Sequence, residues 1–364
     1  RNGGDKTVDY AHTLNNLAIL YKVSGRAALA ETTYEEALAL YKATVGDKSP
    51  AYAEVVSNLA NLYYSQANYK KAELMYEESR KIIETSYGKN SPQYAMALKD
   101  LAKVHYVKSE YGAAEPLYNE ALEILKSRGT NNKEYAAIIN DLASLYRMQG
   151  NEAKALPLLE ESIKINKEIL GDKHPEYARS LYQLAIISYK KEGASPKVEK
   201  MYREVVDICR ANPADANLYG TAVGALANIY NNKGEFEKAE PLYKEGIKVS
   251  RQNLGKKHPT YARNLSNLAI LYRQKGMFDK AIGMFSEVAE IRKEVLGEKH
   301  LEYAKSLREI ADLHYVSKNY IKAEPLYVES NRIFLDQINK NFATLSEKEK
   351  EIFFRFFSNS FHKF

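Results

Sequence analysis

Residues 258–276 read HPTYARNLSNLAILYRQKG, and close variants of this segment recur along the chain. SPAYAEVVSNLANLYYSQA occupies residues 49–67 and SPQYAMALKDLAKVHYVKS occupies residues 91–109. The tyrosine at the fourth position of this stretch occurs eight times, 41 or 42 residues apart, at Tyr10, Tyr52, Tyr94, Tyr135, Tyr177, Tyr219, Tyr261 and Tyr303. So regular a period indicates a solenoid built from one repeated unit.

Each copy predicts two helices. In the seventh copy Leu265, Leu268, Ala269 and Tyr272 stand at i, i+3, i+4 and i+7, which makes one apolar stripe on a helix. The third of these positions is alanine in every copy: Ala18, Ala60, Ala102, Ala143, Ala185, Ala227, Ala269 and Ala311. We expect the methyl group to let a neighbouring helix approach closely, and a larger side chain to overpack the contact.

Glycines separate the helices. One set follows the first helix of a copy: Gly25, Gly150, Gly193, Gly234 and Gly276. A second set follows the second helix: Gly46, Gly88, Gly129, Gly171, Gly255 and Gly297. Glycine suits the left-handed residue that ends many helices, and no segment has sustained strand alternation. Because one helical pair cannot bury its apolar face alone, the sequence predicts an all-α solenoid of eight stacked helix–turn–helix units over residues 1–337.

These motifs resemble a known family. The pattern Leu-x-x-Leu-Ala-x-x-Tyr followed by Ala-x-x-x-Tyr-x-x-Ala is similar to the two helices of the tetratricopeptide repeat (TPR), and the 42-residue spacing with NLAILY and KAEPLY is similar to the repeats of kinesin light chains. The resemblance covers about residues 5–335. It implies a right-handed superhelix whose concave groove is lined by the first helix of each copy. We expect least regularity near residues 188–217, where the turn of copy five and the ANPADAN segment of copy six depart from the pattern.

Composition limits the class of protein. The net charge of +6 over 364 residues is too small to predict nucleic-acid binding, and there is no apolar run long enough to cross a membrane. A single cysteine, Cys209, excludes a disulfide framework within the chain, so we expect a reducing, cytoplasmic location. Because the chain begins with Arg1 rather than methionine, we expect a fragment or a processed protein.

We find no catalytic constellation and expect neither an enzyme nor a cofactor or metal. Cys209 follows apolar Ile208, which is typical of a small core residue. His174, His258 and His300 recur at one linker position but are whole repeats apart, so we interpret them as capping residues rather than metal ligands. The chain contains no glycine-rich phosphate loop, GxSxG, HExxH or CxxC motif.

The informative positions lie on the first helix of each copy, away from the apolar stripe. These residues vary while the core residues do not, and they mix amides, cations and tyrosines, which can bond a peptide backbone, pair with carboxylates and stack. We therefore predict a binding groove for a peptide or partner protein. Its candidate residues are Asn16, Asn58, Asn61, Lys99, Lys103, Tyr106, Asn140, Arg147, Arg179, Tyr182, Asn228, Arg263, Asn267, Arg273 and Arg308.

Two details refine this prediction. Asn16, Asn58 and Asn267 each stand one residue before Leu-Ala, where the resemblance implies contact with a bound peptide backbone. Four cations of copies three to five, Lys99, Lys103, Arg147 and Arg179, form a basic stretch. Asp100 and Asp141 partly neutralise its positive charge. An acidic ligand or a terminal carboxylate is therefore one candidate.

The last segment, residues 338–364, is rich in phenylalanine. Ser346 and Glu349 form a capping box, and a run of phenylalanines then shares one helical face: Phe353, Phe356, Phe357, Phe361 and Phe364. This helix could cap the solenoid or, less favourably, lie on a membrane surface. Its F-x-x-L-S-E-K-E-K-E-x-F pattern also resembles the linker before the caspase-like CHAT protease domain of some bacterial proteins.

Two functions follow. The first is a non-catalytic scaffold that binds a peptide or protein in the groove. The second is the ligand-sensing region of a larger bacterial enzyme, such as a CHAT-type protease, whose catalytic domain would follow residue 364. A nucleic-acid sleeve is disfavoured by the weak net charge.

Overall fold

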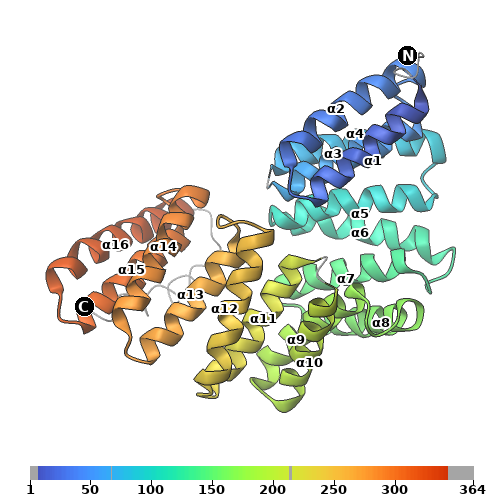
Figure 1. The fold of residues 1–364 in the computed structure, drawn as a ribbon. Helices are drawn as coiled ribbons and strands as arrows, with labels where there is room; N and C mark the ends of the chain where they lie inside the picture. The colour runs from blue at the N-terminus through green and yellow to red at the C-terminus, as the bar shows by residue number, and fades with distance from the viewer. Residues whose placement is uncertain (1–6, 67, 213–214, 343–364) are drawn as a thin grey trace. The chain divides into compact units, whose positions relative to one another are not determined.

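The computed structural model describes residues 7–66, 68–212 and 215–342, with side chains up to residue 336 in the last helix. This part of the chain forms sixteen α-helices and no strand (Figure 1). The helices are α1 (Val8–Val23), α2 (Ala27–Thr44), α3 (Pro50–Ser65), α4 (Tyr69–Tyr87), α5 (Pro92–Val107), α6 (Tyr111–Lys126), α7 (Lys133–Met148), α8 (Glu152–Leu170), α9 (Pro175–Glu192), α10 (Pro196–Ala211), α11 (Ala216–Asn232), α12 (Phe236–Asn253), α13 (Pro259–Gln274), α14 (Phe278–Leu296), α15 (Leu301–Val316) and α16 (Tyr320–Phe342).

The helices pack as consecutive pairs. Odd-numbered helices are the first of each repeat and lie against the even-numbered helix that follows, as in α1 and α2 or α15 and α16, and α9 contacts α10 through Tyr182 and Tyr202. Even-numbered helices such as α4 and α12 also contact the first helix of the next pair, and first helices contact each other, as α5 does α7. The predicted all-α series of helical pairs is confirmed.

The chain divides into two compact units between Ile208 and Cys209. Unit 1 denotes residues 1–208 and unit 2 denotes residues 209–364, and each is described by itself. This division falls within residues 188–217, where the sequence predicts least regularity. The helix α9, which ends inside that segment, has 18 residues, whereas α3, α5 and α7 have 16.

The helix starts confirm the interpretation of the linker histidines as caps. The Nδ1 atom of His174 accepts a hydrogen bond from the backbone N–H of Glu176 at 3.2 Å, and that of His258 accepts one from Thr260 at 3.2 Å. His300 caps α15 in the same way. Other copies use Ser49, Ser91 or Asn132 for this role, so each first helix gains an acceptor for one orphan N–H group.

The turns inside two of the pairs are strained. Gly25, Gly150 and their equivalents adopt a positive φ, as the sequence predicts. In the third and eighth copies the same position holds Ser109, with φ 62°, and Lys318, with φ 59°. Side chains with a Cβ are disfavoured in this left-handed conformation by about 1–2 kcal/mol.

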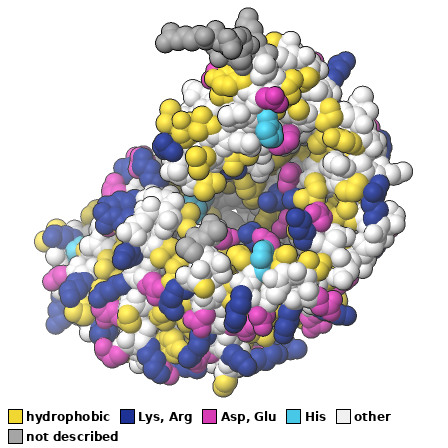
Figure 2. Space-filling model, turned by 45° about the vertical axis from the view of Figure 1, so that its right-hand side comes forward, with side chains coloured by type: hydrophobic (Ala, Val, Ile, Leu, Met, Phe, Trp, Pro, Cys, Tyr) yellow, Lys and Arg dark blue, Asp and Glu magenta, His cyan; other side chains and the backbone are white. Residues whose placement is uncertain are grey.

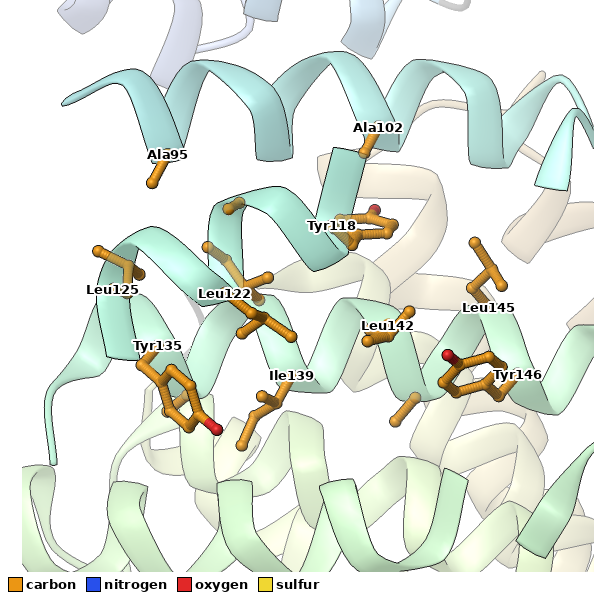
Figure 3. Packing of buried hydrophobic residues seen from close by; sticks show 14 of the residues in the cluster. Ala95, Ala102, Tyr118, Leu122, Leu125, Tyr135, Ile139, Leu142, Leu145 and Tyr146 are labelled. Carbon is orange, nitrogen blue, oxygen red and sulfur yellow. The ribbon is translucent and has the colours of Figure 1, made fainter. Parts of the chain in front are cut away.

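The core is built on the repeated alanines and tyrosines. All eight stripe alanines, from Ala18 to Ala311, are completely buried. In unit 1 one cluster joins three helices: Ala102 of α5, Tyr118 and Leu122 of α6, and Ile139 of α7 (Figure 3). These side chains fill the space between successive pairs, so each pair is stabilised by its neighbour. Cys209 is buried, as expected for a core residue.

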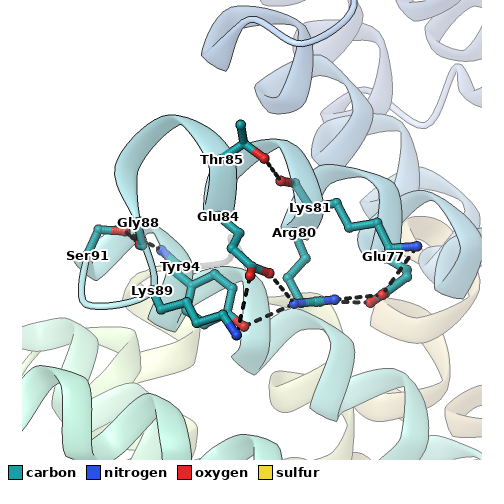
Figure 4. A network of polar contacts seen from close by, with 9 residues as sticks. All are labelled: Glu77, Arg80, Lys81, Glu84, Thr85, Gly88, Lys89, Ser91 and Tyr94. Carbon is teal, nitrogen blue, oxygen red and sulfur yellow. Dashed lines mark hydrogen bonds and ion pairs between the residues drawn. The ribbon is translucent and has the colours of Figure 1, made fainter.

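Polar contacts reinforce the seams. Arg80 of α4 donates to Glu77 at 2.7 and 2.8 Å, to Glu84 at 2.9 Å and to the Tyr94 hydroxyl of α5 at 3.0 Å (Figure 4). Its side chain is only 18% exposed. The network therefore fixes α5 against α4 with charge-assisted bonds that water reaches poorly.

A tighter seam lies in unit 2, where a buried asparagine occupies a space made by glycines. The Asn264 side chain is fully buried and its amide donates to the Gly220 carbonyl oxygen at 3.0 Å. A Cβ atom at Gly224 would lie 2.3 Å from the Asn264 Oδ1 atom, and one at Gly246 would lie 2.8 Å from its Nδ2 atom. Glycine is thus required at both positions by the asparagine of the next repeat.

The predicted Phe-rich segment is only partly covered. The boundary predicted at residue 337 lies inside α16, which continues to Phe342. Residues 343–364, and with them the cap, membrane-surface and linker interpretations, lie outside the described residues.

We predict that Ser109→Gly and Lys318→Gly each raise the melting temperature. Glycine relieves the left-handed strain, and its greater freedom in the unfolded chain offsets part of the gain, leaving about 0.5–1 kcal/mol. Thermal melts followed by circular dichroism measure the effect. Gly150→Ser, the reverse change at an equivalent turn, is the control and should lower the melting temperature. If all three variants melt at the temperature of the parent protein, the backbone at Ser109 and Lys318 is not strained.

We also predict that Gly224→Ala destabilises the protein by about 1–3 kcal/mol, because the new methyl group overlaps the Asn264 amide. Asn264→Ala introduced together with Gly224→Ala removes the overlap, so the double variant should be more stable than the sum of the single effects. Urea unfolding of the four proteins in this cycle measures the coupling. Strict additivity would show that the glycine is not required by the asparagine.

Candidate functional site

The first helices of unit 1 bring polar side chains from successive repeats together. A half-buried carboxylate, Asp141 of α7, shows this convergence most clearly. Burial raises the pKa of Asp141, and Lys103, Lys99 and Arg179 oppose that rise, while Asp100 adds to it. Groups from α5, α7 and α9 therefore lie within electrostatic range of one carboxylate.

Lys99 and Asp100 form an ion pair inside this group. The Lys99 Nζ atom lies 3.2 Å from the Asp100 Oδ1 atom, and the two side chains are 14% and 21% exposed. Arg179 lies beside Glu176, with 3.5 Å between its Nε atom and the Glu176 Oε2 atom. The two arrangements neutralise the outer cations of the predicted basic stretch and leave its middle to Lys103 and Arg147.

Aromatic rings line the last turns of the same helices. Tyr64 of α3 packs edge-on against Tyr69 with ring centres 5.7 Å apart, and Tyr106 of α5 lies 6.0 Å from Tyr111. The Lys103 ammonium group lies 5.7 Å from the Tyr64 ring centre. Burial raises the pKa of both Tyr64 and Tyr106, with further contributions from Asp141. The rings are half-buried, so part of each remains available to a ligand.

Arg147 ends this row on α7. Its Nε atom donates to the Gln183 Oε1 atom of α9 at 3.0 Å. Arg147 also lowers the pKa of Tyr106, in opposition to the effect of burial. Tyr182 of α9 packs edge-on against Tyr202 of α10, with ring centres 5.8 Å apart. The predicted residues Lys99, Lys103, Tyr106, Arg147, Arg179 and Tyr182 are therefore placed on three neighbouring first helices.

Several predicted asparagines of unit 1 have internal partners. The Asn61 Oδ1 atom accepts from the Tyr76 hydroxyl at 2.9 Å, and the Asn58 amide donates to the Asn15 Oδ1 atom at 3.0 Å. Asn140 is buried, with 4% of its surface exposed. Asn16 is exposed. Asn61 and Asn140 thus contribute to packing between helices more than to an open surface.

In unit 2 the predicted residues also engage neighbours. Asn228 accepts from the Tyr243 hydroxyl at 2.5 Å, and Arg263 donates to Thr221 at 2.8 Å. Arg273 pairs with Glu309 of the next first helix. The remaining two predicted residues, Asn267 and Arg308, are half-buried on the first helices α13 and α15.

Two residues that lie on the predicted variable face, but are not among the candidate residues, belong with the unit 1 site. Lys22 of α1 and Tyr64 of α3 stand twelve positions after the repeat tyrosine, as Tyr106 and Arg147 do in their own copies. This shared position in the repeat is the feature of the sequence that could have identified both residues. The row Lys22, Tyr64, Tyr106, Arg147 thus runs across four successive repeats.

The described residues show no metal-binding cluster. No group of three or more His, Cys, Asp or Glu side chains in this part of the chain could hold a metal ion. Among the described helices, none is both long and apolar enough to cross a bilayer. Figure 2 shows basic and acidic side chains mixed over the face drawn, unlike the continuous basic surface of nucleic-acid-binding proteins.

Comparisons with known proteins agree on the fold. Among solved structures the chain resembles a Signal Transduction ATPase with Numerous Domains with a tetratricopeptide repeat sensor from Pyrococcus horikoshii (18% identity, TM-score 0.57, 86% of this chain and 46% of that one). It also resembles a Rap protein complexed with competence and sporulation factor (14% identity, TM-score 0.57, 90% and 98% of the two chains). Kinesin light chain TPR-like repeats from Podosopora anserina are 20% identical, with a TM-score of 0.47, over 59% of this chain and 99% of that one.

No curated protein is significantly similar to the chain in sequence. At the identities of the solved structures, the likeness concerns the fold alone. The family model of the tetratricopeptide repeat, by contrast, matches residues 9–85, 75–127, 134–211, 217–294 and 271–335. The repeated helical pairs and this match together show that the chain belongs to the tetratricopeptide repeat family.

Proposed function

We propose that unit 1 is a non-catalytic binding module that holds an acidic peptide or protein segment against the first helices α1, α3, α5 and α7. One observation carries the proposal. Lys22, Lys103 and Arg147 are half-buried cations that form no ion pair with the described residues; Asp141 and Asp100 act on Lys103 and Lys22 only at longer range. Buried charges in proteins are normally paired, so these three favour an anionic ligand.

The electrostatics of Lys22 support this reading. Burial lowers the pKa of Lys22, the nearby charge of Lys103 lowers it further, and Asp100 only partly opposes them. Two cations from repeats one and three therefore repel each other in a poorly solvated place. A ligand carboxylate between them would relieve that repulsion as well as form charge-assisted hydrogen bonds.

The tyrosines supply the apolar part of the contact. Tyr64 and Tyr106 belong to the second and third repeats, between the repeats of Lys22 and Arg147. Part of each ring remains exposed. Aromatic and arginine side chains provide much of the binding energy in protein interfaces. Three charge-assisted hydrogen bonds of about 1.5–3 kcal/mol each could, with this surface, give micromolar affinity, which requires about −8 kcal/mol.

The predicted residues outside this row would make additional contacts with the ligand. Asn16, Asn58, Lys99, Arg179 and Tyr182 border it on the first helices of unit 1 and would bond the ligand backbone or its flanking groups. The equivalent residues of unit 2, Arg263, Asn267, Arg273 and Arg308 among them, would form a second, separate contact.

A second proposal keeps the same site but assigns it a regulatory role. The chain would then be the sensor of a larger protein with an effector domain, as the predicted CHAT-type linker implies. Both proposals require ligand binding by unit 1. The reading frame after residue 364 distinguishes the two proposals, because only the second requires an effector domain there.

We predict that the chain selects acidic sequences from an array of short peptides that differ in Asp and Glu content and end in a free carboxylate or an amide. Lys103→Ala and Arg147→Ala should each weaken binding about 10- to 100-fold, since each removes a charge-assisted hydrogen bond. Fluorescence anisotropy with the retained peptides gives the affinities.

Lys126→Ala is the matched control, because this lysine lies on the exposed side of α6 and pairs with Glu123. It should leave affinity unchanged. The proposal fails if acidic and amide-capped neutral peptides bind equally, or if Lys126→Ala weakens binding as much as Lys103→Ala.

We further predict that Lys22 loses its proton at lower pH than Lys42, whose pKa is raised by a hydrogen bond to Asp47. Since the neutral amine is the reactive form, acylation of Lys22 should begin at lower pH, as measured by peptide mass spectrometry over a pH series. Lys103→Gln should move the Lys22 midpoint upward, towards the ordinary value. An unchanged midpoint would rule out the repulsion between the two lysines.

A further inference from the structure

The outer side of the last described helix, α16, differs in character from every earlier second helix. Ile321, Val328 and Leu335 stand seven residues apart and are 87%, 63% and 47% exposed. The side of α16 that packs on the rest of unit 2 is formed by other residues, such as Ala323, Ser330 and Phe334. The exposed stripe is therefore not part of the contact between α16 and α15.

The earlier repeats show that this stripe is a special feature. Positions equivalent to Val328 are Glu35, Glu77, Asn119, Glu160, Arg203, Lys244 and Ser286. Positions equivalent to Leu335 are Lys42, Glu84, Lys126, Lys167, Arg210, Arg251 and Lys293. All fourteen are polar. Only α16 has apolar residues at both positions, which marks a surface that another apolar surface covers.

The charges beside the stripe are arranged symmetrically about Val328. Glu324 stands four residues before it and Arg332 four residues after it, and both are exposed. Neither side chain forms an ion pair or hydrogen bond with the described residues. These two residues also line a shallow surface depression together with Pro325, Val328 and Glu329.

We propose that this stripe binds the same stripe of a second copy of the chain, with the two α16 helices antiparallel and Val328 at the twofold axis. In this arrangement Ile321 of each copy lies level with Leu335 of the other, and each Glu324 lies level with an Arg332 across the stripe. A twofold interface has to be self-complementary in this way. A parallel pairing would place Glu324 against Glu324 and Arg332 against Arg332, so the charges select the antiparallel arrangement.

The size of the stripe sets the expected strength. From Ile321 to Leu335 a helix rises about 21 Å, so the contact is short compared with a stable permanent interface. We expect a dimer that dissociates on dilution. The contact uses only unit 2 and is independent of ligand binding by unit 1.

Charge reversal in the full 364-residue chain tests the proposal by sedimentation velocity over a concentration series. Glu324→Arg and Arg332→Glu should each raise the dimer dissociation constant about tenfold or more, because each places like charges together. The double variant should return it to near the parent value. Leu74→Lys, at an exposed leucine of α4 in unit 1, is the matched control and should leave the dimer unchanged.

Cross-linking tests the orientation. Val328→Cys should form a disulfide-linked dimer on mild oxidation, whereas Ile321→Cys and Leu335→Cys should do so only when the two variants are mixed. Linkage of Ile321→Cys to itself would overturn the antiparallel arrangement.

A parent chain that stays monomeric at every concentration, or a double charge variant that fails to recover, would overturn the second copy as the occupant. If Val328→Cys instead forms a link within one chain to a cysteine placed at Phe357, the segment 343–364 covers the stripe.

Discussion

The close approach of neighbouring helices at a fully buried alanine is the contact on which the rest of the structure depends. Ala18, Ala102 and Ala269 represent a position that keeps a methyl group in all eight repeats, and none of these alanines is exposed. Because interiors are close-packed, a larger side chain at this position is expected to overpack the contact between helices. The first helices are consequently held side by side, and their outward positions are left to vary.

The fold could be predicted from the sequence because its determinants are local or repeated. The period, the apolar stripe and the glycine turns depend on residues close together in the chain, and the histidine caps depend on a contact two residues away. The strain at Ser109 was not predicted, because the sequence does not show its backbone angle. The requirement for glycine around Asn264 was not predicted either, because it depends on a side chain of the next repeat.

The candidate site could be predicted only in outline. The sequence places Lys103 and Asn61 on equivalent outward positions of neighbouring repeats, yet Asn61 is held by the Tyr76 hydroxyl while Lys103 lies over the Tyr64 ring. The second helix carries the same tyrosine behind both positions, Tyr76 in α4 and Tyr118 in α6, so the difference arises from the side chain at the position itself and from Tyr64 of the preceding repeat. Lys22 stands on the variable face that the sequence predicts, but it was not among the candidate residues, because its importance comes from the charge of Lys103, two repeats away. Side-chain roles in a solenoid thus depend on neighbouring repeats even when positions do not.

We propose that the half-buried cations and tyrosines of α1, α3, α5 and α7 receive an acidic ligand. A crystal structure of the chain with the tightest-binding acidic peptide tests it most directly. We expect a ligand carboxylate within hydrogen-bond distance of Lys22 or Lys103, and peptide atoms against the rings of Tyr64 and Tyr106. A peptide bound along the second helices, with Lys22, Lys103 and Arg147 still without an anionic partner, would contradict it.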